Sequence, residues 1–189
     1  MTEPLPTAPI RVSPRPMVVD DEGFVIDSWR KSWRTSSQAR RESNRGYHAI
    51  FEDLVLRRLL GAERAEVLIA ANHDDASEIV GWICHTPGHA PHHTPTIHYA
   101  YVRHRTRATG QPARCTGLLA AMLALVGVRD RLVYTFRPAE RRNGHDNRPL
   151  AAEAGLLAAA ARRGLRPAYE PILAWLVDPE PNEESHAGA

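Results

Sequence analysis

The chain has 189 residues, of which 43% are hydrophobic and 24% are charged, and its formal net charge is +2. This length suits one well-packed core and is short for two domains. A net charge so close to zero does not by itself indicate a nucleic-acid binder. The longest apolar run, near residues 118–128, is shorter than the roughly 20 residues needed to span a bilayer, and the amino terminus has no apolar signal core. We therefore expect a cytoplasmic protein with no membrane partner.

Both ends of the chain are predicted to be disordered. Residues 1–16 are rich in proline and show no apolar periodicity, and residues 179–189 have the same character. We expect residues 17–178 between them to form one domain.

Two amphipathic helices are predicted at the start of this domain, over residues 24–33 and 46–60. Asp27 or Ser28 can cap the first helix, and Gly61 is expected to end the second. The apolar positions that define the two faces are Ile26, Trp29 and Trp33, and then Ile50, Leu54, Leu56 and Leu59.

Three strands follow, over residues 65–71, 78–85 and 96–103, because these runs are rich in β-branched and aromatic residues. The turn-forming residues 72–75 separate the first two strands, which predicts an antiparallel meander.

The second half of the domain alternates helix and strand. A helix begins near Ala113, a strand covers 132–136, and Asn147 and Pro149 suit the start of a helix over 149–163 that Gly164 ends. A last strand is expected over 171–177. The order of these segments predicts a mixed α/β fold with a mostly antiparallel sheet and the 96–103 strand in its interior.

The segment between the third strand and the next helix carries the chemistry. A strand that leads through a glycine-containing loop to a helix amino terminus presents N–H groups and a positive helix dipole, which together bind phosphate. Four arginines crowd this turn, at positions 103, 105, 107 and 114. The alternative is that Gly110 serves only tight packing.

At these residues the chain resembles the GNAT superfamily of N-acetyltransferases. The signature of that family is Arg or Gln, two residues, Gly, one residue, then Gly or Ala, and Arg107 to Gly110 match its first half. Pro112 stands where the family has Gly or Ala. Three further segments, 24–34, 79–83 and 97–102, resemble phage-encoded members of the family.

The resemblance implies a splayed central strand and an acyl-CoA, acetyl-CoA or another, as the cofactor. The pantetheine arm would pair with the end of the 96–103 strand, and the pyrophosphate would lie on the loop that follows. The implied cofactor-binding residues are Tyr101, Val102, Arg103, Arg107, Ala108, Thr109, Gly110, Gln111, Pro112 and Ala113.

Acyl transfer in this fold needs a held amine, a base and an acid for the leaving thiolate. His98, Tyr99 and Tyr134 are the candidate catalytic residues, and the alternative for each is a buried side chain with a structural role. The family often takes its acid from a tyrosine on the helix after the fifth strand, but residues 149–163 contain none. The acid is therefore left unassigned.

The leading hypothesis is an enzyme that moves an acyl group to an amine of a small molecule, a protein or a modified nucleobase. The phage resemblance implies DNA modification in a host cytoplasm, with nucleic acid as a partner. One alternative is a GNAT-like binding module that has lost catalysis. Another is a metal-binding protein that uses the histidines between His85 and His104, although their loop lacks a carboxylate and we expect no metal site.

Overall fold

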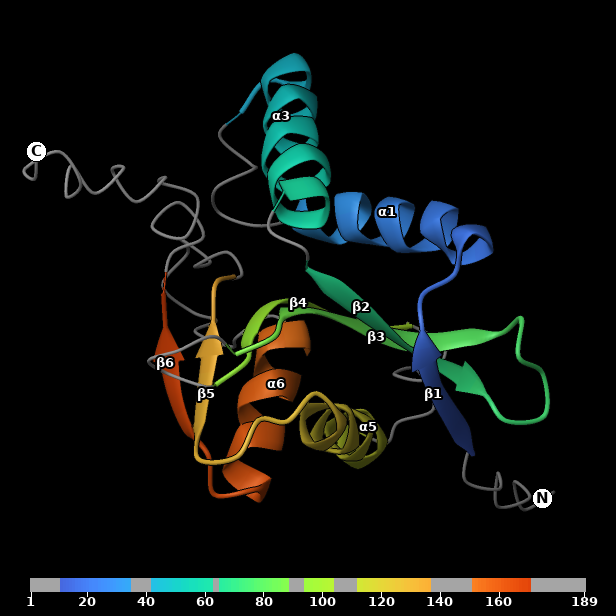
Figure 1. Ribbon diagram of the computed structural model, residues 1–189, viewed down its shortest axis with the longest axis vertical. Coiled ribbons are helices and arrows are strands. Elements are labelled where there is room, and N and C mark those ends of the chain that lie inside the picture. Colours follow the sequence, from blue (N-terminus) through green and yellow to red (C-terminus); the bar gives the residue numbers. More distant parts are fainter. Residues whose placement is uncertain are drawn as a thin grey trace, which may run out of the picture.

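The computed structural model describes residues 11–34, 42–62, 65–88, 94–103, 112–136 and 151–170. Its centre is a six-stranded sheet in which the strands lie side by side in their chain order, β1 to β6. Figure 1 shows α1 and α3 on one side of this sheet and α5 and α6 on the other. The predicted mixed α/β class is confirmed.

The first four strands form an antiparallel meander. They are β1 (Val12–Pro16), β2 (Glu66–Asn72), β3 (Ile79–Thr86) and β4 (Thr96–Val102). All the side chains of β3 are buried, because helices cover the sheet on both faces. The meander was predicted from β2 onward, and the interior position of β4 is confirmed.

The last two strands continue the sheet in parallel. Helix α5 (Pro112–Leu125) leads from β4 to β5 (Arg131–Tyr134), and α6 (Ala151–Arg162) leads from β5 to β6 (Arg166–Tyr169). Gly164 adopts a φ of 67°, a left-handed conformation that ends helices and favours glycine. The strand expected over 171–177 lies outside the described residues, and β6 occupies the sheet edge.

The other face of the sheet is covered by α1 (Val19–Trp33), α3 (Asn44–Phe51) and η1 (Glu52–Ala62). Helix α1 begins five residues earlier than predicted, because the Asp21 carboxylate accepts a hydrogen bond from the Val18 N–H and caps the first turn. The cap expected at Asp27 or Ser28 is therefore wrong.

The predicted helix over 46–60 is α-helical only in α3 and continues as the π-helix η1. A π-helix has i→i+5 hydrogen bonds, and two surface ion pairs follow that spacing, Arg57 with Glu52 at 3.1 Å and Arg58 with Asp53 at 3.4 Å. The buried face of α3 and η1 differs from the predicted one. The buried positions are Tyr47, Phe51, Val55 and Leu59, whereas Ile50, Leu54 and Leu56 are only partly buried.

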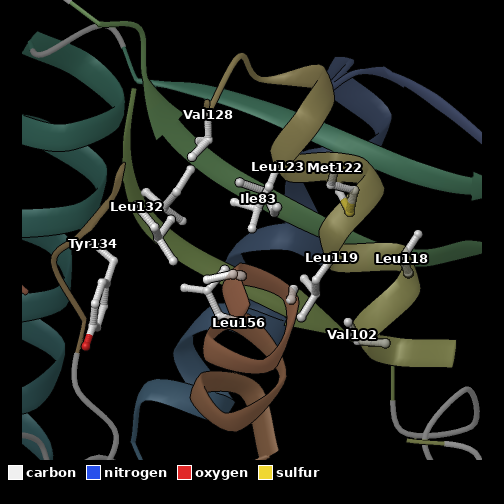
Figure 2. Close-up of a cluster of buried hydrophobic side chains, with 14 of the residues drawn as sticks. Ile83, Val102, Leu118, Leu119, Met122, Leu123, Val128, Leu132, Tyr134 and Leu156 are labelled. Carbon is white, nitrogen blue, oxygen red and sulfur yellow. The ribbon is translucent and has the colours of Figure 1, made fainter. Parts of the chain in front are cut away.

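Two hydrophobic clusters pack on opposite faces of the sheet. The first, here the aliphatic cluster, joins α5 and α6 to the sheet and is drawn in Figure 2. The second, here the aromatic cluster, joins α1, α3 and η1 to the sheet through Trp29, Phe51, Trp82 and Tyr99. Burial of these large side chains is the main contribution to stability, at roughly 1.5–3 kcal/mol for each fully buried residue.

Strand β1 corrects the predicted boundary of the amino-terminal arm, since residues 12–16 were assigned to disorder and are a strand. The five residues of β1 pair with β2, and Arg15 forms two hydrogen bonds with the Asp21 carboxylate. Local composition failed here because the strand depends on partners that lie elsewhere in the chain.

No helix within the described ranges combines the length and apolar character needed to span a membrane.

Candidate functional site

The central feature of the sheet is a fork between β4 and β5, which we define as the point past Ile97 and Tyr134 where the two strands stop pairing. Their register pairs are Thr96 with Val133 and Ile97 with Tyr134, and one further hydrogen bond joins the Thr135 N–H to the Ile97 carbonyl at 3.0 Å. In the described residues no register pair joins the strands beyond this point, although β4 continues to Val102. Phe136 is the last residue described on the β5 side, so the splayed central strand that the resemblance implies stays a prediction.

A β-bulge in β4 lies exactly at the fork. Cys84 of β3 pairs with Tyr99, and the next residue, His85, pairs with Ile97, so that His98 is the extra residue. A bulge bends its strand and increases its twist. The bulge therefore bends β4 beside the last residues that pair with β5.

The His98 side chain connects the strands on both sides of β4. Its Nε2 lies 2.6 Å from Thr86 Oγ1 at the end of β3, and its Nδ1 lies 3.2 Å from Thr135 Oγ1 just after β5. We call these contacts the histidine bridge. His98 is 1% exposed, and this burial, together with His85, lowers the pKa of His98 to about 3. The imidazole is therefore neutral at physiological pH.

Tyr99 points to the aromatic cluster on the α1 side of the sheet. Its hydroxyl donates to Ser32 Oγ of α1 at 2.8 Å, and its ring stacks on Trp29 and Trp82. The ring of Phe136 lies 5.0 Å from the Tyr99 ring, between β4 and the end of β5.

Tyr134 lies on β5 directly at the fork. The ring borders the aliphatic cluster, and Figure 2 shows the hydroxyl oxygen turned away from the apolar side chains. Tyr169 of β6 and Phe136 flank the ring at centroid distances of 5.6 Å and 6.1 Å. Of the three candidate catalytic residues, Tyr134 is the one on β5, and it is the last residue of that strand.

The end of β4 holds three of the predicted cofactor-binding residues. Tyr101 is half-buried against Trp82 and Phe24, and Val102 is buried in the aliphatic cluster. The Arg103 N–H donates to the Val80 carbonyl at 2.8 Å, and its guanidinium lies 3.9 Å from Glu78 and over the Phe24 ring. The strand end is therefore fixed from the β3 side.

Gly81 of β3 makes this close packing possible. A Cβ at this position would lie 2.7 Å from the Tyr101 carbonyl oxygen and 3.4 Å from Leu118 of α5. A side chain would therefore force β3 and β4 apart at the carboxyl end of β4. Gly81 was not among the sequence candidates, because a glycine inside a strand gives no local sign of what approaches it.

The loop expected to bind pyrophosphate is only partly described. Arg107, Ala108, Thr109, Gly110 and Gln111 lie outside the described residues. Pro112 and Ala113 are the first two residues of α5. Proline suits that position, where a helix has no use for the missing N–H. The predicted order of strand, loop and helix is thus observed on both sides of the loop.

The histidine-rich segment shows no metal centre in the part of the chain that is described. No three His, Cys, Asp or Glu side chains converge there, and the carboxylate nearest to the His85 ring in its ion pair is that of Glu66, at 3.9 Å. Burial lowers the pKa of His85, and its Nδ1 has no hydrogen-bond partner. His89, His92, His93 and His104 lie outside the described residues, so the absence of a metal site there stays a prediction.

Sequence reasoning missed Thr86 and Thr135. Threonine is common in strands for its β-branched shape, and the two lie 12 and 37 residues from His98. Only the threonines' isolated positions at strand ends hinted at a polar role.

No protein-family model matches the chain, and no curated protein matches it. Among solved structures, the chain is similar to a candidate GNAT-family acetyltransferase from Desulfovibrio desulfuricans. The identity is 20%, the TM-score is 0.34, and the match covers 63% of this chain and 70% of that chain. The case for a function therefore comes from the geometry of this chain.

Proposed function

We propose that the protein is an acyl-CoA-dependent N-acyltransferase that binds its donor at the fork between β4 and β5. The observation that carries this proposal is the order of a central strand, β4, which pairs with its parallel neighbour β5 only at Thr96 and Ile97 in the described residues, and a helix, α5, that follows it. A narrow acyl-pantetheine arm is long and contains two amides, so it suits a gap between strands. A pyrophosphate suits the N–H groups and dipole of a helix amino terminus.

In this arrangement the pantetheine amides lie along Tyr101, Val102 and Arg103. The pyrophosphate lies on the loop from Arg107 to Gln111 and on Pro112 and Ala113. Pro112 donates no N–H, so the phosphate contacts come from the other residues of the loop and from the Arg107 guanidinium.

The chemistry follows from the positions of donor and acceptor. The lone pair of the amine nitrogen attacks the thioester carbonyl carbon, and a C–N bond forms. The C–S bond then breaks, the sulfur leaves with its electron pair as a thiolate, and the nitrogen loses one proton. Holding the two reactants together supplies most of the acceleration.

Tyr134 is our candidate for the acid that protonates the thiolate. It is the β5 residue at the fork, and its hydroxyl turns away from the aliphatic cluster. The hydroxyl of Tyr99 donates to Ser32 and the His98 ring contacts two threonines, and we assign structural roles to both residues.

The acceptor is an amine of a small molecule, a protein or a modified nucleobase. The resemblance to phage-encoded proteins supports DNA modification in a host cytoplasm as one form of this activity. An alternative is a GNAT-like module that binds a partner without catalysis, which is favoured by the lack of tyrosine in α6.

Calorimetry with acetyl-CoA tests the proposal. Arg107→Ala should weaken binding by about 1.5–3 kcal/mol, the range for a hydrogen bond to a charged group. Gly110→Val should weaken it at least as much, because a Cβ would crowd the pyrophosphate. Arg57→Ala, on the exposed surface of η1, is the control and should bind normally.

Three outcomes separate the hypotheses. Acetyl-CoA at 100 times its dissociation constant should stabilise the enzyme by about 2.7 kcal/mol in thermal unfolding. Stabilisation by zinc without stabilisation by acetyl-CoA would favour the metal-binding alternative. If neither ligand stabilises the protein, or if both substitutions leave acetyl-CoA binding intact, the proposed donor site is wrong.

A further inference from the structure

Packing alone does not explain why a histidine occupies position 98. It is the bulge residue of β4, it is 1% exposed, and it is a polar ring in the interior of a sheet. Burial of an unsatisfied imidazole costs free energy, so its hydrogen-bond partners determine whether the residue stabilises the fold.

The partners match the ring. A neutral imidazole has one N–H donor and one acceptor nitrogen, and each nitrogen faces one threonine hydroxyl, Thr86 at 2.6 Å and Thr135 at 3.2 Å. A hydroxyl can act as donor or acceptor, so one threonine donates to the ring and the other accepts from it. Thr86 and Thr135 are 3% and 2% exposed, so water does not substitute readily for the ring.

The bridge acts at the fork. Thr135 is the first residue after β5, and its N–H donates to the Ile97 carbonyl, the last backbone hydrogen bond between these strands in the described residues. The same residue is thus held to β4 twice, through its backbone and through the His98 ring. Thr86 anchors the other side of the ring to the end of β3. The ring therefore fixes the spacing of three consecutive strands at one level of the sheet.

We propose that His98 is a positioning residue that holds the end of β3 and the residue after β5 against β4, and thereby fixes the strands at the site that receives the acyl-pantetheine arm. The inference rests on the proposed function for the identity of the ligand. It assigns His98 a role through Thr86 and Thr135, and no proton passes between the ring and the substrate.

Hydrogen exchange in the ligand-free protein tests the bridge independently of any ligand. We expect the Thr135 amide to exchange at least tenfold faster in His98→Ala and in Thr86→Val than in the wild type, at matched global stability. Thr96→Val is the matched control, since Thr96 is also a buried threonine and is the β4 partner of Thr86. It should leave exchange at Thr135 unchanged. Equal exchange in wild type and His98→Ala would overturn the proposal.

Acetyl-CoA affinity tests the consequence for the proposed donor site. His98→Ala should weaken binding at least tenfold, and His98→Gln, which retains an amide that can reach Thr86, should recover part of the loss. Thr96→Val should bind as the wild type does. A loss of affinity in Thr96→Val as large as in His98→Ala would show that general destabilisation is the cause, and would overturn the role.

The pH dependence separates positioning from proton transfer. A positioning role predicts that His98→Ala lowers the affinity by the same factor at pH 5.5 and pH 8, whereas a factor that changes with pH contradicts it. If the wild type does not bind acetyl-CoA at all, the proposed function and the role of His98 at the donor site both fail. Faster exchange at Thr135 would in that case still support the bridge.

Discussion

Ile97 and Tyr134 are the last two residues that pair across β4 and β5 in the described part of the chain. The pair places the phenol of Tyr134 at the base of the fork. The bulge residue, His98, comes immediately after Ile97 in β4. The sheet therefore brings Tyr134 and His98 to the same end of the β4–β5 pairing.

Removal of the Tyr134 hydroxyl tests its role as the acid. Tyr134→Phe should lower the single-turnover rate of acyl transfer by about 100-fold or more, because a general acid typically contributes that much, and acetyl-CoA affinity should stay within about twofold. Tyr169→Phe is the control, since its ring lies beside Tyr134 on β6. An unchanged rate in Tyr134→Phe would remove it as the acid.

The neutral state of His98 predicts how stability depends on pH. In the folded chain the pKa of His98 is lowered to about 3, mainly by burial, while in the unfolded chain histidine titrates near pH 6.5. Between these values the unfolded state binds a proton that the folded state excludes. The stability that is present above about pH 6.5 is therefore lost as the pH falls, by up to about 1.4 kcal/mol per pH unit.

Urea unfolding at pH 7.5, 6.5, 5.5 and 4.5 measures this loss. His85, whose pKa burial also lowers, contributes in the same direction. His98→Gln should reduce the slope and leave the contribution of His85. A variant with the slope of the wild type would contradict a buried neutral His98.

Two glycines of opposite surroundings make a matched test of packing. Gly81→Ala should destabilise the protein by about 1–3 kcal/mol, the usual range for overpacking, because its Cβ would lie 2.7 Å from the Tyr101 carbonyl. Gly23→Ala in the exposed part of α1 has nothing within 4 Å and should stabilise by about 0.5–1 kcal/mol. Chemical denaturation checks both, and equal effects in the two variants would argue against the close approach of β3 and β4.

The attachment of β1 depends on Asp21. Asp21→Asn weakens the paired hydrogen bonds to Arg15, and we expect a loss of about 1–2 kcal/mol, discounted because Arg15 is 29% exposed. The Arg15 hydrogen bond lowers the pKa of Asp21, so this contribution is present above the unfolded pKa near 4 and is lost as the pH falls below it.

Denaturant midpoints of Asp21→Asn at pH 7 and pH 3 test this. The midpoints of the wild type and of Asp21→Asn should differ at pH 7 and converge at pH 3. Asp27→Asn is the control on the same helix, because its ion pair with Lys31 is exposed and should matter little. A loss of stability in Asp27→Asn as large as in Asp21→Asn would contradict a specific role of Asp21 in attaching β1.

Local sequence determined the elements whose signals are local. The alternation of β-branched and aromatic residues was enough for β2, β3 and β4, and the apolar run after the glycine-containing loop was enough for α5. These segments bury a face wherever they pack, so their pattern reports their structure. The order of the elements then predicted the mixed sheet with β4 inside it.

Tertiary structure decided the features that depend on distant partners. Strand β1 has prolines and little apolar periodicity, and it exists because β2 and Asp21 hold it. The sequence assigned Ile50, Leu54 and Leu56 to the buried face, whereas packing against α1 and the sheet buries Tyr47, Phe51, Val55 and Leu59. In both cases the energy comes from contacts that no local window contains.

The site divides in the same way. The sequence alone indicated that the end of β4 and the start of α5 are joined by a loop suited to phosphate, because helix dipoles and N–H groups are properties of the backbone. The fork, the bulge and the partners of His98 were decided by the packing of three strands, since a hydrogen bond between residues 37 positions apart leaves no periodic trace in the chain. The structure shows that His98, a candidate proton carrier from the sequence, contacts threonines of the strands on both sides of β4.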